Sequence, residues 1–373
     1  MEHGKELREA AKDGDVKEIA RLLNRGAEIN GADEDGQTAL MWASSKGHLE
    51  CVKDLLDKGA KVNMQNKDGW TALMRASSEG HLECVKVLLD KGAEVNMQMK
   101  NENTALMYAS SKGHLDCVKD LLDKGAKVNM QNKDGWTALM RASSEGHLEC
   151  VKVLLDKGAE VNMQMKNGCT ALILASMKGH LECVRGLLGK GAKVNMQNED
   201  GRTALMWASY SGHLECVKGL LDKGAEVNMQ NKDGWSALML ASMKGHLECV
   251  RGLLDKGAEV NMQDEDGQTA LMLASSEGNL ECVKDLLEEG AEVNMQDKDG
   301  QTALMLASSE GHLECVKDLL DKGAEVNMQD KDGMTALMWA SSKGHLECVK
   351  ALLDNGAKVN MQKKASAVLE DPF

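Results

Sequence analysis

The chain has 373 residues and a formal charge of −14 at pH 7, because 59 acidic side chains outnumber 45 Lys and Arg residues. This charge counts against binding to duplex nucleic acid or to an anionic membrane surface, both of which need cationic side chains. One Pro, one Phe and two Tyr stand beside 37 Gly, 25 Met and 11 Cys. Such a composition is unlike that of an ordinary globular enzyme and indicates a short unit copied many times.

The N-terminal segment is polar. Its first residues, MEHGKELREAAKDGD, hold no apolar run after a basic start, so no secretory signal is predicted. No stretch of the chain approaches 18 consecutive apolar residues, so no membrane-spanning segment is expected. Residues 4–30 look like a degenerate copy of the unit that follows, with a polar outer side. We therefore predict residues 1–32 as an N-terminal capping repeat, which a stacked array needs for solubility.

From Asp33 the sequence repeats every 33 residues, and ten units follow without insertion or deletion to Gln362. Their shared text is D-x-D-G-x-T-A-L-M-x-A-S-x-x-G-H-L-E-C-V-K-x-L-L-D-K-G-A-x-V-N-M-Q. Repeats 1 to 10 cover 33–65, 66–98, 99–131, 132–164, 165–197, 198–230, 231–263, 264–296, 297–329 and 330–362. Residues 66–98 and 132–164 are identical. This identity indicates a tandem duplication of 66 residues.

Each unit predicts a turn followed by two antiparallel helices. In repeat 1, Asp35 and Gly36 form an Asp-Gly turn signal. Thr38 can cap a first helix over 39–46, which Gly47 ends in a left-handed conformation. A second helix is expected over 49–58, because its apolar residues fall on one helical face. An extended return over 60–65 then leads to the next turn.

The repeated text resembles the ankyrin repeat family throughout 33–362, and more distantly over 1–32. It departs from the family pattern at Ala39, where Pro is usual, and at Met41, where a His that stabilises the turn is common. The resemblance implies an all-α repeat fold: an ankyrin solenoid of stacked helix-turn-helix units with protruding β-hairpin-like turns. Residues 363–373 are too short for a helix pair and form an incomplete C-terminal cap. Either the array continues beyond them, or Val368, Leu369 and Phe373 fold back over the last repeat.

Comparison of the ten units separates the residues that all of them share from those that vary. Every Trp and Tyr lies at a varying position, either at the turn tip equivalent to Gln37 or on the first-helix stripe equivalent to Trp42, Ser45 and Lys46. Trp, Tyr and Arg are the residues enriched at protein interfaces. The predicted partner-binding set is therefore Trp42, Trp70, Arg75, Tyr108, Trp136, Arg141, Arg202, Trp207, Tyr210 and Trp235. Packing between repeats remains an open alternative for Trp42, Trp207 and Trp339, because Leu fills the same position in other units.

The remaining reactive residue types follow the repeat and predict no catalysis. Nine histidines recur one per unit and are expected to satisfy loop backbone groups. Ten cysteines, 33 residues apart, lie on the second helices of repeats stacked about 10 Å apart, which is too far for disulfides. They are predicted to be reduced and buried, whereas Cys169 at a turn tip is expected to be exposed. No metal site, cofactor site or enzyme activity is predicted.

The resemblance implies a non-enzymatic scaffold or adaptor that binds another protein on a concave surface. Arg beside aromatic rings predicts a partner with acidic and apolar groups. Single-stranded nucleic acid or nucleotide binding by Trp and Arg stacking is an alternative, although the charge of −14 counts against it. An engineered ankyrin binder is a further alternative, against which Glu102 in a turn and Gly186 in a helix argue. Reduced cysteines indicate an intracellular and most simply cytoplasmic protein, and we expect a monomer without membrane contact.

Overall fold

The computed structural model describes residues 2–363, so most of the predicted C-terminal tail, with Val368, Leu369 and Phe373, lies outside the described residues. The chain divides into two compact halves. The N-terminal half comprises Met1–Ala175 with His180–Lys193, and the C-terminal half comprises Ser176–Gly179 with Val194–Phe373. Within residues 2–363 the backbone forms helices and turns, and one isolated antiparallel bridge joins Gln230 to Ser236.

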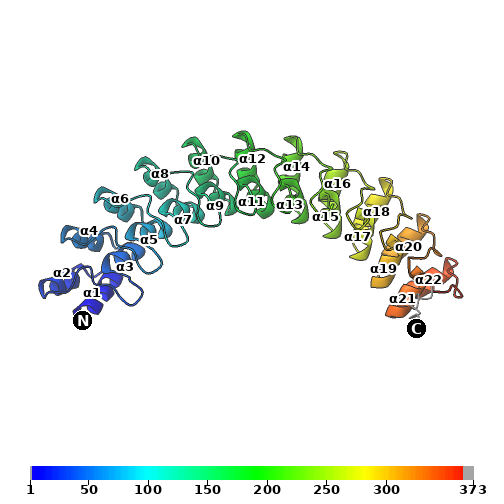
Figure 1. The fold of residues 1–373 in the computed structure, drawn as a ribbon, viewed down its shortest axis with the longest axis horizontal. Helices are drawn as coiled ribbons and strands as arrows, with labels where there is room; N and C mark the ends of the chain where they lie inside the picture. Colours follow the sequence, from blue (N-terminus) through cyan, green and yellow to red (C-terminus); the bar gives the residue numbers. More distant parts are fainter. Residues whose placement is uncertain (1, 364–373) are drawn as a thin grey trace, which may run out of the picture. The chain divides into compact units, whose positions relative to one another are not determined.

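The N-terminal half is a stack of helix pairs, with first helices in one row and second helices in another (Figure 1). The first helix pair is α1 (Glu2–Asp13) and α2 (Val16–Asn24), within the predicted capping repeat. The first helices of the following repeats are α3 (Ala39–Lys46), α5 (Ala72–Glu79), α7 (Ala105–Lys112), α9 (Ala138–Ser144) and α11 (Ala171–Lys178), whose last residues belong to the other half. The second helices are α4 (Leu49–Asp57), α6 (Leu82–Asp90), α8 (Leu115–Asp123), α10 (Leu148–Asp156) and α12 (Leu181–Gly189).

The C-terminal half has, by itself, the same two-row arrangement over five repeats. Its first helices are α13 (Ala204–Tyr210), α15 (Ala237–Met243), α17 (Ala270–Ser276), α19 (Ala303–Glu310) and α21 (Ala336–Lys343). Its second helices are α14 (Leu214–Asp222), α16 (Leu247–Leu254), α18 (Leu280–Glu288), α20 (Leu313–Asp321) and α22 (Leu346–Asp354). The predicted all-α repeat of helix pairs is confirmed in both halves.

Local capping sets the helix boundaries. The Thr38 hydroxyl accepts a hydrogen bond from the Met41 backbone N–H at 3.3 Å, and α3 begins at the next residue, Ala39. Gly47 ends this helix at φ 73°, in the left-handed region that glycine tolerates. The first helix therefore has the predicted limits. The second helix ends one residue earlier than predicted, because Lys58 forms its C-cap rather than its last turn.

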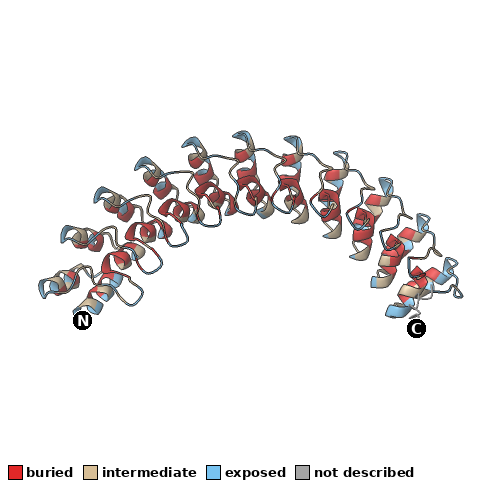
Figure 2. Ribbon diagram, viewed as in Figure 1, coloured by how far each residue is buried: buried red, intermediate tan, exposed pale blue. Residues whose placement is uncertain are grey.

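The core of each repeat lies between its two helices and the helices of its neighbours (Figure 2). In repeat 1 the buried residues include Leu40 and Ser44 from the first helix and Cys51, Val52 and Leu55 from the second. Their equivalents in most other repeats are buried as well. The same face of the last repeat has no described neighbour to cover it. Its second-helix residue Leu346 is accordingly 61% exposed.

Neighbouring repeats are joined by a histidine contact that recurs along both halves. The Nε2 atom of His81 donates to the Ser45 carbonyl oxygen of the preceding repeat at 3.1 Å. Its ring packs on Gly47, where an added Cβ would lie only 2.5 Å from the ring nitrogen. Asn279 replaces the histidine once and makes the same contact, because its side-chain amide donates to the Met243 carbonyl at 2.8 Å. The predicted structural role of the histidines is confirmed.

An asparagine side chain supplies a second link between repeats. Asn63 donates from Nδ2 to the Gly92 carbonyl at 3.2 Å and accepts from the Glu94 backbone N–H at 2.9 Å. Equivalent asparagines make both hydrogen bonds across further repeat boundaries. The hydrogen bonds of one kind always join positions the same number of residues apart, so each repeat is aligned with the next in the same way.

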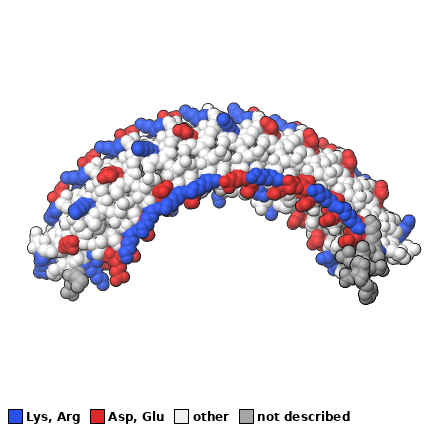
Figure 3. Space-filling view, viewed as in Figure 1, with Lys and Arg blue, Asp and Glu red and all other residues white. Residues whose placement is uncertain are grey.

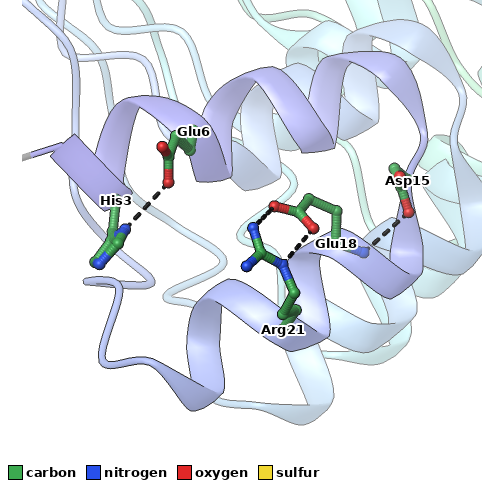
Figure 4. Close-up of polar contacts among 5 residues, drawn as sticks. All are labelled: His3, Glu6, Asp15, Glu18 and Arg21. Carbon is green, nitrogen blue, oxygen red and sulfur yellow. Dashed lines mark hydrogen bonds and ion pairs between the residues drawn. The ribbon is translucent and has the colours of Figure 1, made fainter.

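Polar contacts lie within each helix of the first pair and at the start of α2 (Figure 4). Asp15 caps α2 by accepting a hydrogen bond from the Glu18 backbone N–H at 2.9 Å. The Arg21 guanidinium donates to both carboxylate oxygens of Glu18. In α1, the imidazole of His3 lies 3.1 Å from a carboxylate oxygen of Glu6. These contacts use side chains that remain accessible to solvent.

Candidate functional site

The turn tips of all repeats except 3 and 5 begin with an Asn or Asp. In repeat 2 the Asn66 side-chain oxygen accepts hydrogen bonds from the backbone N–H groups of Asp68 and Trp70, at 3.0 and 2.7 Å. Gly69 has φ 92°, and a Cβ added there would lie 2.8 Å from the Met99 Cα atom. Only glycine fits such a position without a backbone shift. The turn therefore holds Trp70 in a defined position.

The tips are also hydrogen-bonded to one another along the array. The Lys67 backbone N–H donates to the Asp35 carbonyl of the preceding tip at 2.9 Å, and Lys133 repeats this contact with Asn101 at 3.1 Å. Neighbouring tips are therefore linked to one another beside the first helices. All ten predicted site residues lie on these tips and first helices.

Three of the predicted residues form one stacked group in the N-terminal half. The Arg75 guanidinium carbon lies 4.1 Å from the centroid of the Trp70 ring. The Trp70 ring also contacts Tyr108 of the next repeat, with ring centroids 4.4 Å apart and planes tilted by 31°. All three side chains are half-buried. The group is therefore a preformed platform that leaves part of each side chain accessible.

Repeat 3 departs from the shared text in order to hold Tyr108. The Tyr108 hydroxyl donates to the Met99 sulfur at 3.0 Å and accepts from the Asn103 amide at 3.3 Å. The Asn103 carbonyl oxygen in turn accepts from the Asn132 amide of repeat 4 at 2.8 Å. Glu102 takes the turn position of glycine at φ 67°. Sequence reasoning missed Met99 and Asn103, although both interrupt the repeat at tip positions.

Repeat 4 reproduces the Arg–Trp pair of repeat 2. The Arg141 guanidinium carbon lies 4.1 Å from the Trp136 ring centroid. Within residues 2–363, neither Arg75 nor Arg141 makes a hydrogen bond or an ion pair through its guanidinium. Partial burial lowers the pKa of both guanidinium groups below the ordinary value, yet arginine stays charged at neutral pH. The two groups therefore present unused N–H donors beside aromatic rings.

A second group lies in the C-terminal half. The Arg202 guanidinium carbon is 4.8 Å from the Trp207 ring centroid and 5.9 Å from that of Tyr210. The Trp207 and Tyr210 rings meet edge to face, with centroids 6.1 Å apart. Lys244 of repeat 7 adds a cation 4.9 Å from the Tyr210 ring, a partner that sequence reasoning missed. This group again combines cations with aromatic rings.

The remaining predicted residues stand apart from these two groups. Trp42 lies under the Lys12 ammonium of the capping repeat, 5.3 Å from its ring centroid. Trp235 is half-buried at its tip, where its backbone N–H donates to Asn231 at 2.7 Å. At the first-helix position equivalent to Trp42, Leu240 and Leu273 are buried. Side chains at this position therefore pack partly against neighbouring repeats, whether or not they also contact a partner.

The charge on this face differs between repeats (Figure 3). The tips and first helices of repeats 2–4 carry six cationic residues, Lys67, Arg75, Lys100, Lys112, Lys133 and Arg141, and five anionic ones, Asp68, Glu79, Glu102, Asp134 and Glu145. Those of repeats 8–10 carry Lys298, Lys331 and Lys343 against nine anionic residues, Asp264, Glu265, Asp266, Glu277, Asp297, Asp299, Glu310, Asp330 and Asp332. Within a chain of net charge −14, repeats 2–4 are thus the more favourable place for an acidic partner.

The ten periodic cysteines are free and buried, as predicted. Burial raises the pKa of the Cys183 thiol to about 11 from its ordinary 9.0. It raises the pKa of the Cys51 and Cys84 thiols in the same way. The prediction that Cys169 is exposed was wrong, because this side chain is only 8% exposed. Gln37, at the same tip position of repeat 1, is also only 9% exposed, so this position is covered in the folded array although it lies in a turn.

The described part of the chain, residues 2–363, contains no cluster of three or more His, Cys, Asp or Glu residues arranged to hold a metal ion. It also contains no helix that is long and apolar enough to cross a membrane.

Comparison with protein families identifies the repeats. A family model of three consecutive ankyrin repeats matches the chain over residues 7–99, 91–165, 160–231, 223–297 and 278–363. The chain belongs to the ankyrin repeat family. A comparison with curated proteins finds no significant match. Ankyrin repeats are generally non-catalytic and typically form protein-interaction modules, so the groups on the tips and first helices are candidate contacts for a protein partner.

Proposed function

We propose that this ankyrin protein is a non-enzymatic scaffold that binds another protein through its turn tips and first helices. The observation that carries the proposal is the pair of guanidinium groups at Arg75 and Arg141. Each is half-buried, stacked on a Trp ring 4.1 Å away, and without a hydrogen-bond or ion-pair partner in residues 2–363. Binding energy at protein interfaces concentrates in Trp, Tyr and Arg residues that are held in place before binding.

Capture of partners from a cell lysate tests the proposal. Trp70→Ala and Trp136→Ala each remove an aromatic ring that contacts an arginine. If these residues are hot spots, each substitution should weaken partner binding by about 2 kcal/mol, roughly thirtyfold in the dissociation constant. Circular dichroism should show that the helices are intact, because the turn hydrogen bonds to Asn66 come from backbone N–H groups.

Gln268→Ala and Gln301→Ala are matched controls, because they change the same tip position in repeats without aromatic residues. Both should bind the captured partner as the unmodified chain does. Normal binding by the two Trp variants would contradict the proposal, and the aromatic residues would then serve packing between repeats.

Single-stranded nucleic acid is the second candidate partner. The contact between the Trp70 and Tyr108 rings and the neighbouring lysines of the tips would suit stacked bases and a phosphate backbone. Binding of this kind falls steeply with salt concentration. A fluorescently labelled 20-nucleotide single strand, titrated at 50 and 200 mM salt, should bind weakly or not at all if the partner is a protein. Tight, salt-sensitive binding would favour nucleic acid instead.

We also propose an intracellular location. The ten periodic cysteines are free and buried, and proteins of oxidising compartments usually pair their cysteines in disulfides. Microscopy of the tagged full chain, in a cell type that contains the captured partner, tests this location.

A further inference from the structure

Arg75 and Arg141, both in the N-terminal half, make the same contact with a tryptophan of their own repeat. Repeats 2 and 4 have the same sequence, and each guanidinium lies 4.1 Å from the tryptophan of its own repeat. The only repeat between them carries Tyr108 where they carry arginine. The face therefore presents two equivalent cationic anchors with an aromatic ring between them.

Each anchor is suited to a carboxylate. A guanidinium has five N–H donors in one plane and binds a carboxylate through two parallel hydrogen bonds. Stacking on a ring fixes that plane, so little side-chain freedom is lost when the acceptor binds. The nearest acidic residues on the same elements, Asp68 and Glu79 in repeat 2 and their equivalents in repeat 4, make no ion pair with either arginine. The donors are thus available to a partner.

The repeat spacing sets the distance between the anchors. Packed helices lie 8–10 Å apart, so positions two repeats apart are separated by about 20 Å. An extended peptide advances about 3.3 Å per residue and covers this distance in about six residues. Tyr108, halfway between the anchors, is half-buried and offers its accessible edge to a side chain near the middle of such a peptide.

We propose that Arg75 and Arg141 bind two carboxylate side chains of one extended peptide segment, placed about six residues apart, with an apolar side chain between them against Tyr108. This inference rests on the proposed protein-binding function and specifies the partner segment. A carboxylate fits better than a phosphate group, because Asp68, Glu102 and Asp134 on the same tips oppose a second negative charge per group. The acidic face of repeats 8–10 would repel the same segment.

Selection from a phage-displayed library of random 12-residue peptides tests the inference on the full chain. Enriched peptides should share two Asp or Glu residues six positions apart, with an apolar residue two or four positions after the first, because these positions share one face of an extended chain. A synthetic peptide of the enriched sequence should lose affinity about thirtyfold with Arg75→Gln and equally with Arg141→Gln, because removal of one partner from a buried charge pair has about this effect.

Two further variants separate charge from geometry and from folding. Arg75→Lys keeps the charge but not the planar fork, so it should recover only part of the lost affinity. Gln301→Ala should bind the peptide normally, and thermal unfolding should confirm that every variant is folded. Moving the two acids of the synthetic peptide to three or nine positions apart should lower the affinity to that of a peptide with one acid.

The outcomes distinguish this inference from the proposed function. Enriched peptides without paired acids, or an affinity that does not depend on acid spacing, would overturn the inference. If Trp70→Ala still weakened binding of those peptides, the proposed binding face would stand. A preference for a phosphorylated version of the synthetic peptide over its acidic version would also overturn it. The inference and the proposed binding face would both be overturned if no peptide were enriched. They would also be overturned if the enriched peptides bound the Trp70→Ala and Trp136→Ala variants with unchanged affinity.

Discussion

Substitution of Gly186 by Ala should stabilise the chain, because this glycine lies inside α12 with ordinary helical geometry. Glycine in a helix interior costs about 0.5–1 kcal/mol relative to alanine. The structure leaves room for the methyl group, since the nearest atom to an added Cβ is Leu148 Cδ1 at 3.8 Å, an ordinary van der Waals distance. The expected gain is therefore about 0.5–1 kcal/mol.

The same substitution at a turn should have the opposite sign. Gly69 has φ 92°, and its added Cβ would lie 2.8 Å from the Met99 Cα atom, which is backbone and cannot turn away. A left-handed conformation alone costs a residue with a side chain about 1–2 kcal/mol. Gly69→Ala should therefore destabilise the chain by at least this amount, although both substitutions add one methyl group.

Hydrogen exchange followed by mass spectrometry measures both effects locally, which matters because a repeat array need not unfold in one step. Amides of α12 should exchange about two- to fivefold more slowly in Gly186→Ala than in the unmodified chain. Amides of the repeat 2 tip should exchange faster in Gly69→Ala. Faster exchange of α12 in Gly186→Ala would refute the reasoning, since it would show that packing against Leu148 has no room for a methyl group.

Three further predictions follow from the repeats. Gly186, Gly219 and Gly252 lie in the second helices of repeats 5–7, so hydrogen exchange should be faster over 165–263 than over 264–329, and equal rates would contradict this. The Cys183 thiol has a pKa of about 11 in the folded chain and 9.0 when exposed, so the unfolded chain loses the thiol proton at lower pH. The contribution of this thiol to the free energy of unfolding is therefore complete below pH 9 and is lost between pH 9 and 11. Urea unfolding across this range should therefore show a shallower loss of stability in Cys183→Ala than in the unmodified chain, and equal losses would exclude this effect. His81→Ala removes the hydrogen bond to Ser45 and should lower the free energy of unfolding in urea by about 1 kcal/mol. His81→Asn should lower it less, because Asn279 makes the equivalent contact. A larger loss for His81→Asn than for His81→Ala would rule out this role.

The helix pairs could be predicted from the sequence because their boundaries depend on local residues. Thr38 and Gly47 cap the first helix through their own backbone and side-chain geometry, and the predicted limits are confirmed. The end of the second helix was predicted one residue too late, because Lys58 is a residue that a helix can equally include. The pattern of shared residues also predicted the buried cysteines, since a residue that every repeat keeps is needed for stacking.

The side-chain arrangement of the site depends on contacts that a repeat pattern does not contain. Cys169 was predicted to be exposed because it lies at a turn tip, yet its side chain is buried, as is that of Gln37 at the same position of repeat 1. The stacking of Arg75 on Trp70 joins two residues five positions apart across a turn and a helix start, and the contact of Trp70 with Tyr108 crosses a repeat boundary. Lys244 beside Tyr210 crosses another. Such contacts require the repeat geometry in addition to the residue types.

The uniform links between repeats have a consequence for folding. His81 and His147 make the same hydrogen bond to the preceding repeat, and repeats 2 and 4 are identical in sequence. The end surface of repeat 1 therefore recognises repeat 4 as well as it recognises repeat 2. During folding, repeat 4 can therefore stack on repeat 1 with every hydrogen bond of that interface formed, which leaves 66 residues looped out. Between two chains, the same pairing would exchange the 66-residue segment. Correct assembly then depends on the order in which neighbouring repeats meet, which favours growth outward from one end as the chain is synthesised.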